Sequence, residues 1–174
     1  MKFLFAMLFS KTTFFIMRKI GMAATTLPGR IALLFKGNIL KKLSKDTRVI
    51  IVTGTNGKTT TCRMIEEGLI IGKKSYFANK SGANLITGIT TAFIENSNKL
   101  GKCKTEYALI ECDENAFKKV SLYIKPFAVV VTNVFRDQLD RYGEVMTTLN
   151  AIKHSLENIE KTNLILNADC SLTY

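Results

Sequence analysis

Two patterns of apolar residues alternate along most of the chain. Short uninterrupted runs, at residues 49–53 (VIIVT) and 127–132 (FAVVVT), are typical of strands buried on both faces of a sheet. Longer segments, of which 58–71 is the clearest, carry apolar residues at helical spacing. The further expected strands are 75–78, 107–112 and 163–167, and the further expected helices are 84–95, 114–124 and 144–159.

This alternation predicts an α/β fold with a doubly wound, mostly parallel sheet. Ligands of such sheets bind at the carboxyl ends of the strands. Polar residues follow three of the expected strands at that point, namely Thr53-Gly54, Asp113 and Thr132-Asn133. We therefore expect a site at this edge of the sheet.

Residues 1–46 form a separate segment, which we interpret as a basic N-terminal helical arm before a domain at 47–174. Its helical pattern is broken at 26–29 (TLPG). Residues 1–48 contain ten Lys or Arg and one acidic residue, whereas 49–174 contain fifteen basic and thirteen acidic residues. The arm therefore suits an anionic membrane surface, a nucleic acid or a solvated helix face.

The first seventeen residues, MKFLFAMLFSKTTFFIM, are apolar but are interrupted by Lys11. No small-residue cleavage site follows, so the pattern favours a helix that is buried or lies on a membrane over a secretory signal. The chain has no run of eighteen uninterrupted apolar residues that would span a membrane.

Cysteines provide no metal-binding pattern. Cys62, Cys103, Cys112 and Cys170 lack CxxC spacing, so we expect free thiols in a reducing compartment and no zinc site in this chain. Cys62 lies early in an expected helix, where the helix dipole would lower the pKa of its thiol.

The stretch 53–60 (TGTNGKTT) joins an expected strand to an expected helix. The common phosphate-binding pattern is GxxxxGK[ST], and its first glycine would fall at Val52. The rest of the pattern is present from Gly57 onward. A buried strand before the loop and a helix after it are the context in which such a loop binds nucleotides.

The chemistry of the loop does not need the missing glycine. Gly54 and Gly57 allow backbone amides to turn inward, and the helix that follows presents its positive end to phosphates. Lys58 reaches the outer phosphates, and the Thr59 hydroxyl can bind Mg²⁺. The expected nucleotide-binding residues are Gly54, Thr55, Asn56, Gly57, Lys58, Thr59 and Thr60.

The stretch TGTNGKT resembles the ATP loop of the Mur ligase superfamily, which includes the folylpolyglutamate synthases. The resemblance implies that ATP activates a carboxylate as an acyl phosphate, which an amine then converts to an amide. The strand end 111–114 (ECDE) resembles a second family motif, so the resemblance implies that Glu111 binds Mg²⁺ together with Thr59.

The stretch 133–144 (NVFRDQLDRYGE) resembles the family motif Asn-x-x-x-Asp-His-Leu-Asp, with Gln138 at the histidine position. That histidine helps to hold a second metal in ordinary Mur ligases, so the second metal stays open here. Together with 81–89 (SGANLITGI) and 27–32 (LPGRIA), the stretch is similar to MurT-type subunits of lipid II isoglutaminyl synthases. The resemblance implies catalytic roles for Lys58, Glu111 and Asp137, and it makes Asn133, Gln138, Asp140 and Lys153 further candidates.

Such a subunit amidates the α-carboxylate of D-glutamate in lipid II, using ammonia from a GatD-type glutaminase partner. The implied location is cytoplasmic, at the inner face of the membrane, with contact through residues 1–48. MurT-type proteins continue into a four-cysteine zinc insertion and a C-terminal domain that docks the glutaminase. Neither is in this sequence, so we expect 47–174 to be an incomplete central ATP-binding domain of the Mur ligase type.

Three other functions remain as alternatives. The first is a Mur-type or folylpolyglutamate-type ligase that adds an amino acid, and the second is a truncated ATP-binding module without catalysis. The third, a nucleic-acid ATPase, normally has the full phosphate-binding pattern and an apolar strand that ends in Asp. Here Thr132-Asn133 follows the apolar run, so we rank it last and expect no nucleic-acid partner.

Overall fold

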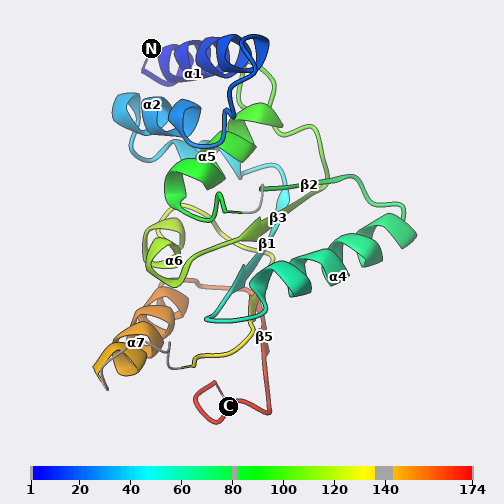
Figure 1. The fold of residues 1–174 in the computed structure, drawn as a ribbon, viewed down its shortest axis with the longest axis vertical. Coiled ribbons are helices and arrows are strands. Elements are labelled where there is room, and N and C mark those ends of the chain that lie inside the picture. The colour runs from blue at the N-terminus through cyan, green and yellow to red at the C-terminus, as the bar shows by residue number, and fades with distance from the viewer. Residues whose placement is uncertain (1, 80–81, 136–142, 174) are drawn as a thin grey trace.

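The computed structural model describes residues 2–79, 82–135 and 143–173. Figure 1 shows helices α1 and α2 at one end of the molecule and the C-terminal residues at the other. No helix within these described residues is long and apolar enough to cross a membrane. In chain order the elements are α1 (Lys2–Lys19), α2 (Leu27–Phe35), α3 (Ile39–Leu43), β1 (Arg48–Thr53), α4 (Lys58–Ile71), β2 (Tyr76–Ala78), α5 (Ile86–Glu95), β3 (Tyr107–Glu111), α6 (Glu114–Val120), β4 (Ala128–Val131), α7 (Gly143–Glu157) and β5 (Asn163–Leu166).

The five strands form one parallel sheet in the order β2-β3-β1-β4-β5. This confirms the predicted α/β fold with a doubly wound parallel sheet. The register places Val52 of β1 opposite Glu111 of β3, and Thr53 opposite Val131 of β4. The carboxyl ends of these three central strands therefore lie side by side, as expected.

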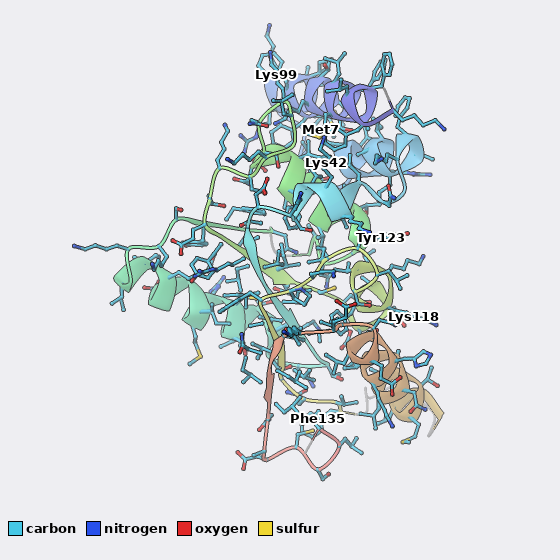
Figure 2. All side chains as sticks on the ribbon, turned by 180° about the vertical axis from the view of Figure 1, so that it is seen from behind. Met7, Lys42, Lys99, Lys118, Tyr123 and Phe135 are labelled. Atoms are coloured by element: carbon cyan, nitrogen blue, oxygen red, sulfur yellow. The ribbon has the colours of Figure 1, made fainter. Side chains whose placement is uncertain are left out.

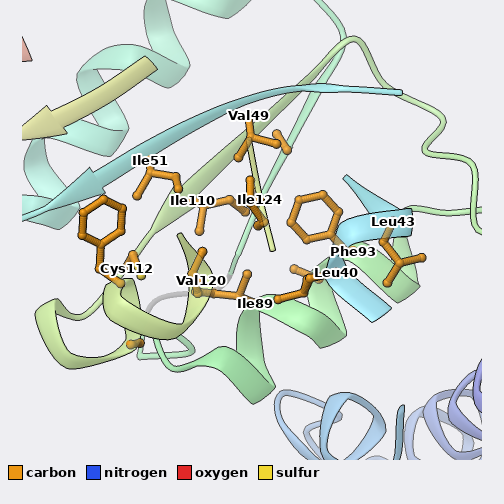
Figure 3. Packing of buried hydrophobic residues seen from close by; sticks show 14 of the residues in the cluster. Leu40, Leu43, Val49, Ile51, Ile89, Phe93, Ile110, Cys112, Val120 and Ile124 are labelled. Atoms are coloured by element: carbon orange, nitrogen blue, oxygen red, sulfur yellow. The ribbon is translucent and has the colours of Figure 1, made fainter. Parts of the chain in front are cut away.

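Helices cover both faces of the sheet, which explains the uninterrupted apolar runs of the central strands. On one face, side chains of α3, α5, α6 and α7 pack with β1, β3 and β4 in the main core. Figure 3 shows part of this core, with Ile51 and Ile110 of the sheet beside Val120 and Ile124. On the opposite face, Cys62 and its neighbours on α4 pack against the sheet in a smaller cluster.

The N-terminal helices join the main core, because Phe3, Met7 and Ala32 belong to it. The expected break at 26–29 is wrong in detail, since α1 ends at Lys19 and α2 begins at Leu27, so the break lies at residues 20–26. Proline fits the first turn of a helix, where its missing N–H has no intrahelical partner. The division of the chain at residue 46 stays a prediction.

Gly29 has a packing role rather than a helix-breaking one. Its N–H donates a hydrogen bond to Thr91 Oγ1 on α5 (2.9 Å). A methyl group at position 29 would lie 1.9 Å from the carbonyl oxygen of Thr87. The absence of a side chain therefore lets α2 lie directly on α5.

We predict opposite effects of alanine at two helical glycines. Gly29→Ala should lower the free energy of unfolding by roughly 1–3 kcal/mol, because the methyl group forces α2 away from α5. Gly68→Ala on α4, where an added methyl group has no atom within 4 Å, should raise it by about 0.5–1 kcal/mol. Urea denaturation measures both, and equal effects at the two positions would contradict this account of Gly29.

Candidate functional site

The loop from Gly54 to Gly57 connects β1 to α4, and both glycines have positive φ angles, of 122° and 81°. Two constraints exclude a side chain at Gly54. The first is its positive φ angle, which L side chains rarely adopt. The second is space, because a Cβ atom would lie 2.4 Å from Thr132 Oγ1 and 2.7 Å from the Asn133 carbonyl oxygen. Gly57 faces open space, so its conformation is what favours glycine there. The chain therefore turns sharply at the carboxyl end of the sheet.

Asn133 holds the loop from the end of β4. Its Oδ1 accepts a hydrogen bond from the Asn56 N–H (3.0 Å), and its Nδ2 donates one to the Asn56 carbonyl oxygen (3.0 Å). Its own carbonyl oxygen accepts from the Thr55 N–H (2.9 Å). The expected site residue Asn133 thus lies beside the loop and fixes the backbone there.

The first turn of α4 offers backbone donors next to this loop. The first intrahelical hydrogen bond runs from the Thr61 N–H to the Gly57 carbonyl oxygen (2.9 Å). Residues 58–60 precede it, so their amides have no intrahelical acceptor and are available to an anion. Lys58 and Thr59 are half-buried at this position, whereas Thr60 is exposed.

Lys58 folds back over the loop. Its Nζ donates hydrogen bonds to the carbonyl oxygens of Gly54 and Thr55, the latter at 3.0 Å. The same ammonium group lies 3.4 Å from Glu114 Oε1 on α6, and both side chains are only 14% exposed. Two carbonyl oxygens and one carboxylate therefore bind the ammonium group of Lys58. An anion bound in the loop would compete with these oxygens for the ammonium group.

Glu111 and Thr59, the two residues expected to bind a metal ion, are brought together. Thr59 Oγ1 donates a hydrogen bond to Glu111 Oε2 at 2.9 Å. Asn79, which follows β2, holds the backbone of Glu111: its Oδ1 accepts from the Glu111 N–H and its Nδ2 donates to the Glu111 carbonyl oxygen, each at 2.8 Å. Asn79 is itself buried.

Sequence reasoning missed both Asn79 and Glu114. Glu114 could have been suspected, because it stands three residues after Glu111 in the same strand-end motif. Asn79 had no such signal apart from its place directly after a strand. The neighbouring Asp113 has a structural role, since its carboxylate accepts hydrogen bonds from the N–H groups of Asn115 (2.9 Å) and Ala116 (3.3 Å) and caps α6.

A pocket of about 340 Å³ opens beside the loop, toward β4 and β5. Val130, Ile165 and Leu166 give it apolar walls, while polar atoms come from Asn133 and Asn167. Sequence reasoning also missed residues 165–167, whose place beside the loop depends on β5 lying next to β4. An apolar pocket with a few polar groups suits a flat organic ring.

Four expected residues are not among the side chains that the structure describes at this site. Asp137, Gln138 and Asp140 lie outside the described residues. Lys153 is exposed on α7 and has no hydrogen bond or ion pair with the site residues that the structure describes.

Cys62 contradicts the expectation of a lowered pKa. Burial raises the pKa of its thiol to about 12, and the carboxylates of Glu111 and Glu66 act in the same direction. Desolvation of the thiolate therefore outweighs the helix dipole. All four cysteines are free and buried, as expected of unpaired thiols.

The described groups suit one kind of ligand. Open amides at the positive end of α4, together with Lys58, attract phosphate groups. The oxygen atoms of Thr59 and Glu111 are hard donors, 2.9 Å apart, of the kind that Mg²⁺ takes alongside phosphate oxygens and water. The arrangement therefore suits a polyphosphate that carries a divalent cation.

Comparisons with known proteins bear on the family and the fold of the chain. Residues 52–173 match the model of the Mur ligase middle domain. The chain is 39% identical over 169 residues to the MurT subunit of lipid II isoglutaminyl synthase (glutamine-hydrolyzing) from Streptococcus pneumoniae, which covers 97% of this chain and 37% of that protein. The chain thus spans between a third and two fifths of that relative's length.

Solved structures share the fold. MurF from Acinetobacter baumannii superposes with a TM-score of 0.67 at 22% identity, covering 83% of this chain and 31% of that one. MurF from Thermotoga maritima, solved in complex with ADP, superposes with a TM-score of 0.62 at 18% identity. The superposition covers 79% of this chain and 32% of that one. At these identities the likeness concerns the fold.

We predict that Asn133→Ala loosens the loop. Losing the two side-chain hydrogen bonds to Asn56 should cost about 1 kcal/mol and speed hydrogen exchange of the Asn56 amide. Asn98→Ala is the matched control, because Asn98 Oδ1 accepts from the N–H groups of Leu100 and Lys102 in an exposed turn. Unchanged exchange at Asn56 in Asn133→Ala, measured by NMR, would show that the loop holds its shape without this side chain.

Proposed function

Because this chain belongs to the Mur ligase family, we propose that it binds ATP with Mg²⁺ and uses it to convert a carboxylate into an amide. We further propose that the carboxylate is that of D-glutamate in lipid II and that ammonia comes from a GatD-type glutaminase. The likeness to a MurT subunit supports this choice of substrate and partner. The reaction would take place in the cytoplasm, at the inner face of the membrane.

One contact carries the proposal, the hydrogen bond from Thr59 to Glu111 beside Lys58. It joins a hydroxyl from the phosphate loop to a carboxylate from the neighbouring strand end. In the proposed complex these two oxygens bind Mg²⁺, which neutralises charge on the phosphate oxygens when it is bound. The amides of residues 57–60 would then hold the phosphates, and the base would lie in the pocket beside Val130 and Ile165.

Lys58 has the most direct part in the proposed reaction. It would exchange the Gly54 and Thr55 carbonyl oxygens and Glu114 for the outer phosphates of ATP. The carboxylate attacks the γ-phosphorus and ADP leaves, which gives an acyl phosphate. Ammonia then attacks the acyl carbon and phosphate leaves. Lys58 and the amides stabilise the charge that develops on the transferred phosphoryl group.

The proposal also includes residues for which the structure describes no contact with the site. We propose that Asp137 and Asp140 contact metal, water or the loop, without a proton-transfer role. Lys153 and Gln138 stay candidates for the same region. Residues 47–174 would form the ATP-binding domain and 1–46 its N-terminal arm.

We predict that Thr59→Val and Glu111→Gln each weaken binding of Mg²⁺-ATP by about tenfold or more, since each removes one charge-assisted oxygen contact. Binding of ATP in the presence of EDTA should change little. Calorimetry with and without EDTA separates the contribution of Mg²⁺ to ATP binding from the contribution of the protein's direct contacts with the nucleotide. Glu67→Gln is the control, because Glu67 is an exposed carboxylate on α4, the helix that also carries Thr59. A Mg²⁺ dependence that survives in Glu111→Gln would remove this residue from the metal site.

The reaction itself is tested with glutamine that carries heavy nitrogen in its side-chain amide. With ATP, lipid II, the glutaminase and a complete subunit that contains this domain, the label should appear in the muropeptide as a carboxamide, detected by mass spectrometry. Lys58→Ala should lower the rate by about a hundredfold or more, because one preorganised charge is lost from the transition state. Lys99→Ala, an exposed lysine in a loop, should leave it unchanged.

Other outcomes of this experiment point elsewhere. Incorporation of a free amino acid instead of labelled ammonia would replace the amidation proposal with an amino-acid ligase. ATP binding without ADP formation would indicate a nucleotide-binding module.

A further inference from the structure

Helix α1 is apolar on its outward side as well as on its packed side. Figure 2 shows Met7 on the side that faces the body of the molecule, where Phe3 and Ala6 are also buried. The opposite side presents large apolar residues, with Leu8 61% and Phe15 67% exposed. We call this side the outer apolar face, formed by Leu4, Phe5, Leu8, Phe9, Phe15 and Ile16, which recur at helical spacing.

The outer apolar face continues onto α2. Phe9 and Phe35 stack with ring centroids 5.4 Å apart and planes 5° from parallel. Leu34, next to Phe35, is 80% exposed. Figure 1 shows the two helices packed together at the end of the molecule. A contiguous apolar surface of this kind on a folded protein marks a contact site, because leaving it in water is unfavourable.

Lys11, the residue that interrupts the apolar sequence of α1, does not interrupt this face. Its Nζ donates hydrogen bonds to the carbonyl oxygens of Ile94 (2.8 Å) and Ser97 (2.6 Å) at the carboxyl end of α5. Arg18 forms an ion pair with Glu95 at 3.0 Å. Both charges thus tie α1 to the body, so a surface that binds α1 would hold the whole domain.

The charges around the face have one sign. Neither α1 nor α2 contains an acidic residue, and Lys2, Lys19 and Arg30 are exposed. Within the described part of the chain, Lys19 and Arg30 have no ion pair. Phenylalanine and leucine side chains beside uncompensated basic groups match a bilayer surface that carries anionic lipids. A nucleic acid would match the basic groups but not the apolar side chains.

We propose that the outer apolar face docks on a membrane surface containing anionic lipids, with α1 and α2 lying in the interface. Apolar side chains enter the headgroup region, and the basic residues meet lipid phosphates. In Figure 1 strand β1 runs away from α1, so the phosphate loop at its far end faces away from the docked surface and stays accessible to nucleotide. The proposal does not depend on the ligase activity, because docking requires no ATP.

Vesicle co-sedimentation of the chain without nucleotide tests it, using phosphatidylcholine vesicles with and without phosphatidylglycerol. The wild type should bind the anionic vesicles more tightly, and Lys19→Gln with Arg30→Gln should weaken that binding by about fivefold per residue. Phe5→Gln with Phe15→Gln should abolish most binding to either vesicle. Both phenylalanines are exposed, so the fold should be retained, as circular dichroism can confirm.

Met64→Gln with Ile71→Gln is the matched control, since both residues are exposed apolar side chains on α4, outside this face. It should bind vesicles like the wild type. Equal loss in the control, or no loss in the phenylalanine variant, would overturn the proposal. So would a dimer in vesicle-free solution that the phenylalanine variant converts to a monomer, because a second copy would then be the occupant of the face.

Discussion

The close approach of the chain at Gly54 to the end of β4 sets the geometry of the whole site. The Thr132 N–H donates to the carbonyl oxygen of Thr53 (3.0 Å), and a side chain at position 54 would collide with Thr132 and Asn133. Because the backbones meet there, Asn133 can reach Asn56 on the far side of the turn. That contact curves the loop and directs the first turn of α4, with its open amides, toward the edge of the sheet.

Each neighbouring strand then adds one part to this turn. Glu111 lies at the end of β3 and accepts a hydrogen bond from Thr59, because the sheet register places Glu111 opposite Val52 of β1. Asn79 follows β2 and fixes the backbone of Glu111. On the other side, β5 contributes apolar wall to the pocket. The strand order of the sheet therefore assembles the candidate site from segments that are far apart in sequence.

Local patterns in the sequence predicted the alternation of strands and helices and the loop, whereas the pairing of Thr59 with Glu111 was implied by the resemblance to the Mur ligase superfamily. They did not predict Asn79, whose role depends on β2 lying beside β3. The Pro28-Gly29 pair was interpreted as a break because both residues interrupt helices, yet proline suits a first turn and glycine allows contact with α5. For Cys62, burial outweighed the helix dipole, and burial is a property of the folded chain.

The central claim, that nucleotide phosphates and a divalent cation meet between Thr59 and Glu111, has a direct test. Mn²⁺ replaces Mg²⁺ in many such sites, and its unpaired electrons broaden the NMR signals of nearby amides. With Mn²⁺ and ATP, the amides of residues 55–60 and of Glu111 should broaden first, whereas those of α1 should stay sharp. Broadening that spares Glu111, or that is spread evenly over the surface, would contradict the account.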